Sequence, residues 1–522
     1  MQAISGAKTM AAFHPSSCRM TAPAAALCVA LVGGCNVGPP YVAPDTPAPA
    51  TFKEALPAAY HAAPPGTWQP AQPQDAALKG KWWEVFNEPE LDALEDQLNI
   101  DNQNIAQYFQ NFMAARAQVS EARAGYFPTL AVAPAYSRTG TGAASKASGG
   151  GGTSGAASSH GASYASSYSL PFEVSWEPDL WGRIQNTVHE YQYAAQVSAA
   201  DLENERLTEQ AALAAYFFEL RGQDALQDLY DRTVVADRKS LDLTRALAET
   251  GIDNDLAVAQ AEVTLKNAEA TATGIATNRA LYEHAIATLI GKPASAFSMP
   301  VKLLATQVPE IPVAIPSQML QRRPDVAAAE RTMAQQNAII GVEMAAFYPT
   351  ISLTGSGGLQ SVTLGQLFSL PALSWSLGAS ASETIFDAGL RSATVAQYTA
   401  TYNADVASYK QTVLTAFQQV EDYIATLRVL SAQIIKQDAA VKAAQRYLDI
   451  ATSQYETGLE PYLNVMTAET TLLGDQQTLV TLRVSEMMAA VQLVQALGGG
   501  WDVTQLPTAT QVTEDETPSK GQ

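Results

Sequence analysis

Few residues of this chain have the type and spacing that catalysis or metal binding requires. His61, His160, His189 and His284 are scattered along the sequence, without the spacing of metal ligands. The stretch Gly291-Lys292-Pro293 lacks the upstream glycine and the following hydroxyl of a phosphate-binding loop. No nucleophile elbow is evident either. We therefore expect no catalytic residue, no metal site and no cofactor, and we predict that the protein is not an enzyme.

Acidic side chains instead gather at two glycine turns of similar sequence. The first turn reads Glu249-Thr250-Gly251-Ile252-Asp253-Asn254-Asp255, and the second reads Glu456-Thr457-Gly458-Leu459-Glu460. Each turn lies between two long helical patterns. Its acids, Asp253, Asp255 and Glu460, can be solvated charges that favour helix ends, or they can have a functional role.

The two turns belong to an internal repeat. A constant offset of 207 residues carries Gly251 onto Gly458, Ala261-Glu262 onto Ala468-Glu469, and Gly182 onto Gly389. It also carries Tyr216, Leu220 and Arg221 onto Tyr423, Leu427 and Arg428. A register held over this length indicates a duplicated unit. We therefore expect one large body with pseudo-twofold symmetry.

Composition excludes some partners and favours helices. The chain has 522 residues, a formal net charge of −20 and a pI near 4.7. Nucleic-acid binding needs a basic surface, so we expect no nucleic-acid partner. Charged residues make up 16% of the chain, while alanine, serine, threonine and glutamine are abundant. Long helices of this composition would meet through small side chains.

The three cysteines lie near the N-terminus, at positions 18, 28 and 35, so no disulfide is possible after Cys35. The apolar stretch 21–32 follows Lys8 and Arg19, as in a secretory signal. It ends in Leu31-Val32-Gly33-Gly34-Cys35, which resembles a bacterial lipobox with Cys35 as the lipidated residue. The alternative is an ordinary signal cleaved elsewhere. Met10 and Met20 are alternative translation starts.

Long helical patterns dominate the two repeats. One begins near Gly182 and lasts to about Thr250, roughly 68 residues or about 100 Å. Its antiparallel partner covers 253–290, and the second repeat matches the pair with 389–457 and 460–497. Before the first pair, Trp82-Trp83-Glu84-Val85-Phe86 opens a shorter helix that we expect to continue to about Gly125.

Four strand candidates complete the pattern, two in each repeat. The clearest, Tyr164 to Glu177, places Leu170, Phe172, Val174 and Trp176 on one face and polar residues on the other. A membrane-spanning strand needs this alternation, but a half-buried strand of a soluble sheet shows it too. Aromatic residues at the strand ends favour the membrane: Tyr126, Phe127, Trp176, Trp181, Phe347, Tyr348, Trp375 and Phe386.

Counting strands predicts an assembly. Beyond the signal no run of eighteen apolar residues is present, so the mature chain would cross a membrane only as a closed β-barrel. Four strands are too few to close one. Three copies would supply twelve strands, which makes a trimer the natural closure, although counting alone leaves a dimer or a tetramer open.

We divide the chain accordingly. The predicted parts are a signal peptide (1–34), a lipid-anchored, proline-rich extended segment (35–80), a first repeat (81–290), a linker or equatorial region (291–316), a second repeat (317–497) and a C-terminal equatorial tail (498–522). Each repeat contains a helix, a β-hairpin (129–177 or 349–386) and a long helical hairpin (183–290 or 389–497). The predicted fold class is α+β: a long antiparallel α-helical barrel continuous with a transmembrane β-barrel.

Five segments, in order, resemble one family. The chain is similar to the TolC-like outer membrane efflux factors, in the lipoprotein branch that serves tripartite RND-type multidrug pumps. The segments are Ser175-Trp176-Glu177-Pro178-Asp179-Leu180-Trp181-Gly182-Arg183, Gln321-Arg322-Arg323-Pro324-Asp325-Val326 with Ala329-Glu330, Phe347-Tyr348-Pro349-Thr350-Ile351-Ser352-Leu353, Ile385-Phe386-Asp387-Ala388-Gly389 and Leu497-Gly498-Gly499-Gly500-Trp501.

The resemblance implies a lipid-anchored homotrimer in the cell outer membrane that extends into the periplasm. It implies a passive conduit with two partners, a periplasmic adaptor (membrane fusion) protein and an inner-membrane RND-type pump. The turns at Gly251 and Gly458 would be the periplasmic tips, where the channel closes and the adaptor docks. Alternatives are a conduit for type I protein secretion and, outside the channels, a periplasmic coiled-coil scaffold lipoprotein.

The tip departs from the family pattern. The family commonly carries acids six or nine positions after the glycine of the second repeat, in a ring that helps gating. Here Asn464 and Thr467 occupy these positions, and Ala257 and Gln260 are their counterparts in the first repeat. We therefore expect a gate that depends on packing and polar contacts, including Tyr455, more than on charge. The gate candidates are Gly251, Asp253, Asp255, Tyr455, Gly458, Glu460, Asn464 and Thr467.

Removing the predicted lipid distinguishes the channel hypothesis from the scaffold hypothesis. We expect a Cys35→Ala protein still to require detergent for extraction and to run as a heat-modifiable trimer, because the strands would hold it in the membrane. Extraction without detergent would support the scaffold instead. The measurement is membrane fractionation followed by electrophoresis of heated and unheated samples.

Overall fold

A computed structural model describes residues 36–45, 49, 52–54, 80–141, 163–251, 253–304, 311 and 321–513. The predicted signal peptide, Cys35 and most of the Gly/Ser-rich tract lie outside these ranges. The chain divides into two units. One unit contains the sheet, in 1–39, 123–187 and 338–396, and the other is helical, in 40–122, 188–337 and 397–522.

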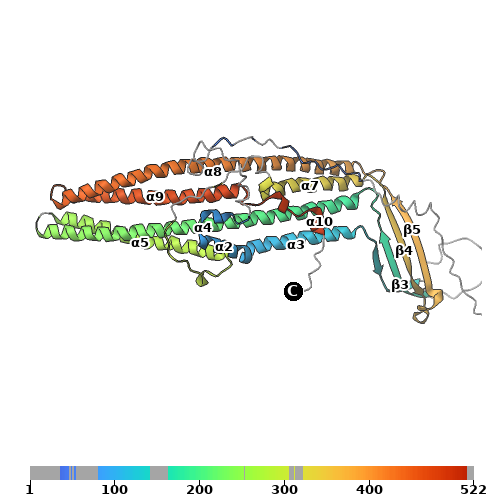
Figure 1. The fold of residues 1–522 in the computed structure, drawn as a ribbon. Helices are drawn as coiled ribbons and strands as arrows, with labels where there is room; N and C mark the ends of the chain where they lie inside the picture. Colours follow the sequence, from blue (N-terminus) through green and yellow to red (C-terminus); the bar gives the residue numbers. More distant parts are fainter. Residues whose placement is uncertain are drawn as a thin grey trace, which may run out of the picture. The chain divides into compact units, whose positions relative to one another are not determined.

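Two long helical hairpins form most of the helical unit (Figure 1). The first joins α4 (Arg183–Glu249) to α5 (Asp255–Leu289), and the second joins α8 (Leu390–Glu456) to α9 (Tyr462–Ala496). The long helices α4 and α8 have 67 residues each, and α5 and α9 have 35 each. These bounds agree with the helical patterns predicted from the repeat.

Shorter elements pack beside the hairpins. They are η3 (Trp82–Phe86), α2 (Pro89–Asp101), α3 (Gln103–Ala124), η5 (Ala294–Ala296), α7 (Pro324–Ala345), η8 (Val503–Gln505) and α10 (Ala509–Thr513). The prediction of a single helix from Trp82 to about Gly125 was wrong, because this stretch forms η3, α2 and α3. The chain breaks at Asn102, whose Oδ1 accepts from the Ile105 amide at 3.0 Å and whose Nδ2 donates to the Leu289 carbonyl at 2.9 Å. A side chain that caps the following helix favours this break.

The main core of the helical unit surrounds the middle of the long helices. Trp82 is fully buried, and its indole Nε1 donates to Gln210 Oε1 at 3.0 Å. Phe86 lies with its ring centroid 5.0 Å from that of Phe218 on α4. The same core takes apolar residues from α8 and α9, among them Val420, Leu427, Val491 and Leu493. The two repeats therefore share one hydrophobic interior.

Parts of the proline-rich segment lie against the second repeat. The Tyr41 hydroxyl donates to Glu330 Oε1 of α7 at 2.6 Å. Farther along, the backbone amides of Lys53 and Glu54 donate to the two carboxylate oxygens of Glu421 on α8, at 2.7 and 2.9 Å. The Glu54 side chain also pairs with Arg428 at 2.6 Å. These contacts fix the described residues of the segment to the helical surface.

The sheet unit contains five strands in the described residues, not the four predicted. They are β1 (Thr129–Val132), β2 (Ala135–Thr141), β3 (Ser163–Trp176), β4 (Thr350–Ser361) and β5 (Leu373–Ser382), with η6 (Leu364–Gln366) and η7 (Leu370–Ala372) between the last two. All neighbours are antiparallel, in the order β1-β3-β4-β5, and β2 also pairs with β3. The first predicted strand is divided in two at Ala133 and Pro134, because proline has no amide for the ladder.

Aromatic residues at the strand ends make specific contacts within the sheet unit. Trp176 Nε1 donates to the Tyr126 carbonyl at 3.0 Å. Trp181 Nε1 donates to the Pro349 carbonyl at 2.8 Å, and its ring stacks on Tyr348 at a centroid distance of 4.9 Å. The broad apolar faces of the strands are open in the single chain, as Leu377 shows with 81% exposure. No helix in the described ranges is both long enough and apolar enough to cross a membrane.

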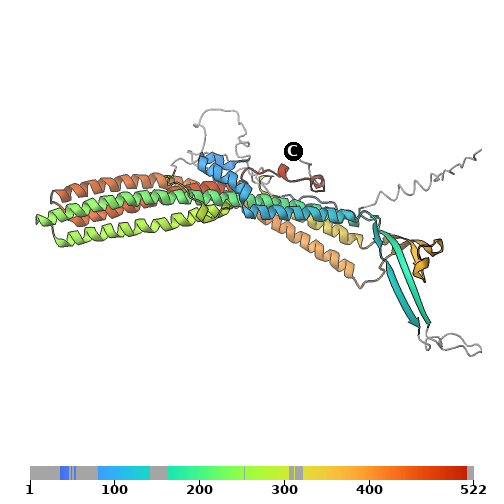
Figure 2. The same ribbon diagram turned by 90° about the horizontal axis from the view of Figure 1, so that it is seen from below.

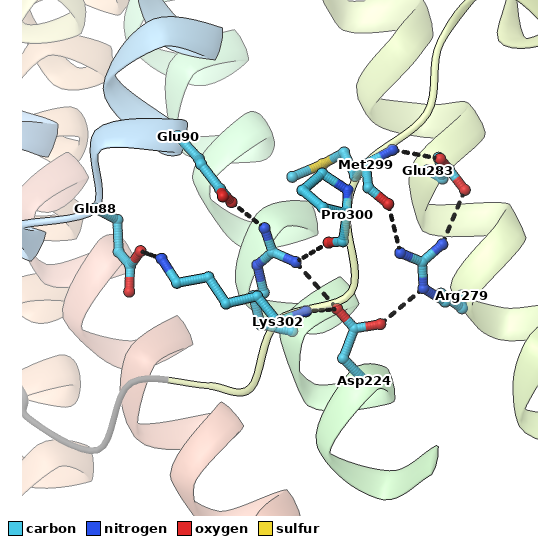
Figure 3. A network of polar contacts seen from close by, with 9 residues as sticks. Glu88, Glu90, Asp224, Arg279, Glu283, Met299, Pro300 and Lys302 are labelled. Carbon is cyan, nitrogen blue, oxygen red and sulfur yellow. Dashed lines mark hydrogen bonds and ion pairs between the residues drawn. The ribbon is translucent and has the colours of Figure 1, made fainter. Parts of the chain in front are cut away.

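A buried ion network holds the segment after α5 to both α4 and the start of α2 (Figure 3). Asp224 of α4 accepts from Arg221 at 3.0 Å and from Arg279 of α5 at 2.7 Å. Arg221 also pairs with Glu90 and donates to the Pro300 carbonyl at 2.7 Å. Further contacts come from Arg279 to the Met299 carbonyl, from the Met299 amide to Glu283, and from Lys302 to Asp224 and Glu88.

Removing one buried cation from this network should destabilise the protein strongly. We expect Arg221→Met to lower the free energy of unfolding by about 3 kcal/mol, because the buried Asp224 loses one of its two arginine partners and the Pro300 carbonyl loses its donor. The measurement is the thermal unfolding midpoint of the purified protein in detergent. The matched control is Arg232→Met on the same helix, whose pair with Asp228 is exposed and should contribute less than about 1 kcal/mol. Equal shifts for the two variants would contradict the expectation.

Candidate functional site at the hairpin turns

The turns of the two long hairpins lie at the same end of the helical unit (Figures 1 and 2). Each turn has its glycine in the left-handed region, with φ of 75° at Gly251 and 73° at Gly458. The Gly251 amide donates to the Ala248 carbonyl at 3.0 Å, and the Gly458 amide donates to the Tyr455 carbonyl at 2.9 Å. An L side chain at these φ values would cost about 1–2 kcal/mol. The glycines are therefore needed to end α4 and α8 sharply.

The start of α5 is capped by side chains of the first turn. Asn254 Oδ1 accepts from the Ala257 amide at 3.1 Å, and Asp253 Oδ1 accepts from the Asn254 amide at 2.8 Å. Asp255 occupies the first turn of α5, where a negative charge interacts favourably with the helix dipole. Its side chain is exposed. For Asp255 the geometry favours the interpretation as a helix-end charge.

A hydrogen bond between side chains joins the two hairpins at their turns. The Tyr455 hydroxyl of α8 donates to Asp253 Oδ2 at 2.7 Å. Tyr455 is 4% exposed, and its ring lies 5.5 Å from the ring of Tyr462 on α9. Burial, together with the neighbouring Asp253, raises the pKa of Tyr455 to about 12. The hydroxyl therefore keeps its proton and acts as the donor to the carboxylate.

An apolar cluster supports this hydrogen bond from behind. It takes Leu241 from α4, three residues from α5, Ala451 and Tyr455 from α8, and three residues from α9. The α5 members are Ala257, Ala261 and Leu265, and the α9 members are Tyr462, Val465 and Ala468. Because all four long helices contribute, separating the hairpins here would expose apolar surface, which is unfavourable in water.

The remaining candidates make only local contacts. Asn464 Nδ2 donates to Glu460 Oε2 at 2.6 Å, and both belong to the second hairpin. The Thr467 hydroxyl donates to the Leu463 carbonyl of its own helix at 2.8 Å. Of the eight predicted residues, the structure brings Tyr455 and Asp253 together across the hairpins. Gly251 and Gly458 shape the turns.

Sequence reasoning missed a group of polar residues deeper in the hairpins. Ser240 of α4 donates to Glu469 Oε1 of α9 at 2.8 Å. Asp237 and Thr244, on the same helix as Ser240, are buried. The available signal was the spacing of these three residues, which places them on one helix face. In the sequence, Glu469 stands out only as the repeat counterpart of Glu262.

The described residues hold no cluster of three or more His, Cys, Asp or Glu side chains that could bind a metal ion. What the turns offer is a contact between two helical hairpins. It can hold the hairpins together or release them.

Comparisons with known proteins agree with this architecture. The family described as outer membrane efflux protein matches residues 94–292 and 315–499. The antibiotic efflux pump outer membrane protein ArpC of Pseudomonas putida is 31% identical over 491 residues, which cover 94% of this chain and 97% of that protein. The toluene efflux pump outer membrane protein TtgC, also of Pseudomonas putida, is 30% identical with the same coverage.

The chain belongs to the outer membrane efflux protein family. Both repeats are matched, so the membership applies to nearly the whole architecture, and the protein is placed in the outer membrane. Among solved structures, the outer-membrane channel OprN superposes with a TM-score of 0.78 at 25% identity, covering 90% of this chain and 100% of that one. The family resemblance and the fold class predicted from the sequence are confirmed.

The contact between the hairpins can be tested directly in this efflux protein. We expect Tyr455→Phe to keep the ring packing but to lose the hydrogen bond to Asp253, which weakens the contact by about 1 kcal/mol. Amide hydrogen exchange in peptides that span the two turns should then become about five-fold faster.

The control is Tyr447→Phe, an exposed tyrosine on the same helix, which should leave exchange unchanged. Adding Asp253→Asn to Tyr455→Phe should have little further effect. Independent, additive effects of the two substitutions would show that the pair does not act as a unit.

Proposed function

We propose that three copies of this chain form the outer membrane channel of a tripartite efflux pump. The channel would be a passive conduit, with a periplasmic adaptor protein and an inner-membrane RND-type pump as partners. The observation that carries the proposal is the family match over both repeats, together with the two long hairpins that meet at one end. Related proteins are described as exporting antibiotics and toluene, which favours small, largely apolar substrates.

The exposed surfaces of the single chain support an assembly. The edges of the sheet, β1 with β2 on one side and β5 on the other, have no further neighbour among the residues that the structure describes. Unpaired edges are costly in lipid. On α8, Leu414, Val429 and Ile435 are each more than half exposed. Since β1 and β2 continue along one edge of β3, each chain would supply four strand positions, and a trimer would supply twelve to a closed barrel.

Cys35 would anchor the assembly by a lipid. The residue itself lies outside the described ranges, and its role rests on the lipobox-like sequence before it. The following residues support a path along the protein: the Val37 amide donates to the Trp181 carbonyl at 3.3 Å, and Asn36 exchanges side-chain hydrogen bonds with Asn186. A chain fixed at this point would begin close to the strand-to-helix junction of the sheet unit.

The gate would close by packing and by the Tyr455–Asp253 hydrogen bond. Tyr462 and the small residues Ala257 and Ala261 fill the space behind this bond. Neither Asn464 nor Thr467 supplies a negative charge, so the tip would lack the ring of acids that binds cations in related channels. The three acids near the turns would help to cap helices and to orient neighbouring side chains.

Conductance measurements test both the channel and its uncharged gate. We expect the purified protein, reconstituted in planar lipid bilayers, to form channels with only weak block by divalent cations, because no acid stands at positions 464 or 467. Strong block that is abolished by Asn464→Ala, but not by neutralising Asp253, Asp255 and Glu460, would contradict the gate. The absence of any channel would contradict the function.

A conduit for type I protein secretion remains the alternative within the channels. The two functions differ in a deletion strain: loss of an efflux channel raises susceptibility to small toxic compounds, whereas loss of a secretion conduit removes a protein from the medium. Restoration of compound resistance by the wild-type gene supports efflux.

A further inference from the structure

Behind the gate, α4 carries a row of polar side chains on the face that packs against α9. Asp237, Ser240 and Thr244 follow one another at intervals of three and four residues, which places them on one side of the helix. Leu241 on the same side belongs to the apolar cluster of the turns. The row therefore lies within the contact between the two hairpins.

Two carboxyl groups in this contact are short of hydrogen-bond partners. Asp237 is 3% exposed, and its Oδ2 has no partner among the described residues. Glu469 accepts from Ser240 through Oε1, but its buried Oε2 has no partner in the same ranges. An ionised carboxylate that is buried without donors is strongly disfavoured. A protonated carboxyl is far less costly at the same place.

Among the described residues, no cation compensates the two carboxyls. Burial alone shifts the pKa of Asp237, whereas Ser240 and Asp237 both act on Glu469, and both carboxyls in turn act on Tyr462. Tyr455 of α8 lies next to Tyr462, and α5 contributes Ala261 and Leu265 to the same cluster. No Lys, Arg or His side chain in the part of the chain that the structure describes contributes to the pKa shift of Asp237 or of Glu469.

The row is specific to one of the two repeats. The offset of 207 residues carries Asp237 onto Ala444 and Thr244 onto Ala451, and both alanines are buried. It carries Glu469 back onto Glu262, which is exposed on α5. The equivalent positions thus hold a buried apolar pair and a solvated acid. The second repeat thus has no equivalent of the carboxyl pair of the α4–α9 contact at these positions.

We propose that Asp237 and Glu469 form a proton-dependent latch between the hairpins. While the carboxyls carry protons, α4 and α9 stay packed, and loss of the protons drives the two helices apart and loosens the turns beyond them. The inference deepens the proposed channel function, because it assigns regulation by pH to the gate. Acidic conditions favour the closed gate.

The pKa shifts have the direction that the latch requires. Burial raises the pKa of Asp237 to about 6. Burial and the neighbouring Asp237 raise the pKa of Glu469 to about 7, against a lowering effect of Ser240. A raised carboxyl pKa gives stability that is fully present below about pH 4 and is lost as the pH rises through these values. The contact therefore weakens progressively from about pH 4 and has lost this stability above about pH 7.

The test uses the full-length protein in detergent or lipid between pH 5 and 8. Infrared spectroscopy should show the carbonyl stretch of a protonated carboxyl that disappears over this range. After correction for the intrinsic pH dependence, hydrogen exchange in 237–244 and 462–472 should become about ten-fold faster or more. Glu469→Gln with Asp237→Asn should remove the infrared signal and keep the slow exchange at every pH.

Glu262→Gln is the matched control, because it changes the exposed repeat counterpart of Glu469, and it should behave like wild type. Constant exchange in the wild-type protein, or an unchanged pH response in the double variant, would overturn the latch. Should the double variant fail to fold, the pH dependence of exchange in 237–244 and 462–472 of the wild-type protein decides, because exchange locates the change and the infrared signal can also come from the buried Glu95. If exchange in the wild-type protein becomes faster with rising pH as expected, but the protein forms no conducting channel in bilayers, the result contradicts the channel function and still supports the latch.

Discussion

The structure depends on the burial of very long helices. A helix of 67 residues extends about 100 Å, and an isolated helix in water gains little without an apolar surface to pack against. The 35-residue partner in each hairpin covers only part of this length. The two repeats must therefore cover each other, and the shorter helices, with their buried tryptophans, complete the interior. Small side chains at the contacts let the helix backbones approach closely.

Buried charged groups inside this packing either meet an opposite charge or lack one, and the two cases have different consequences. Around Asp224, each buried charge meets an opposite charge or a backbone carbonyl. Such a network holds one arrangement, because any movement would expose a charge to apolar surroundings. Around Asp237, by contrast, Asp237 Oδ2 and Glu469 Oε2 have no partner among the described residues. The network around Asp224, near the middle of the long helices, therefore favours a rigid region. The carboxyls of Asp237 and Glu469, nearer the turns, favour a contact between α4 and α9 that can open.

Much of the fold could be predicted from the sequence, because its strongest signals repeat. The 207-residue offset, the two glycines with positive φ and the helical periods placed the four long helices to within a few residues. Local exceptions were missed where one side chain overrides the pattern. Asn102 caps α3 and ends α2, and Pro134 divides the first strand. In the site, Tyr455 and Asp253 were both among the predicted gate residues, but their hydrogen bond was not predicted, since pairing across hairpins depends on tertiary packing.

Equivalent residues of the two repeats have different surroundings and partners. Arg221 is buried in the ion network, whereas its counterpart Arg428 is half-exposed and pairs with Glu54. Glu54 and Lys53 meet Glu421 across a separation of more than 360 residues. Residues near the N-terminus thus cover part of the surface of α8, which lies in the second repeat. Residues 53 and 54 can therefore dock only after α8 has formed, which couples the order of the segment near the N-terminus to the folding of the second repeat.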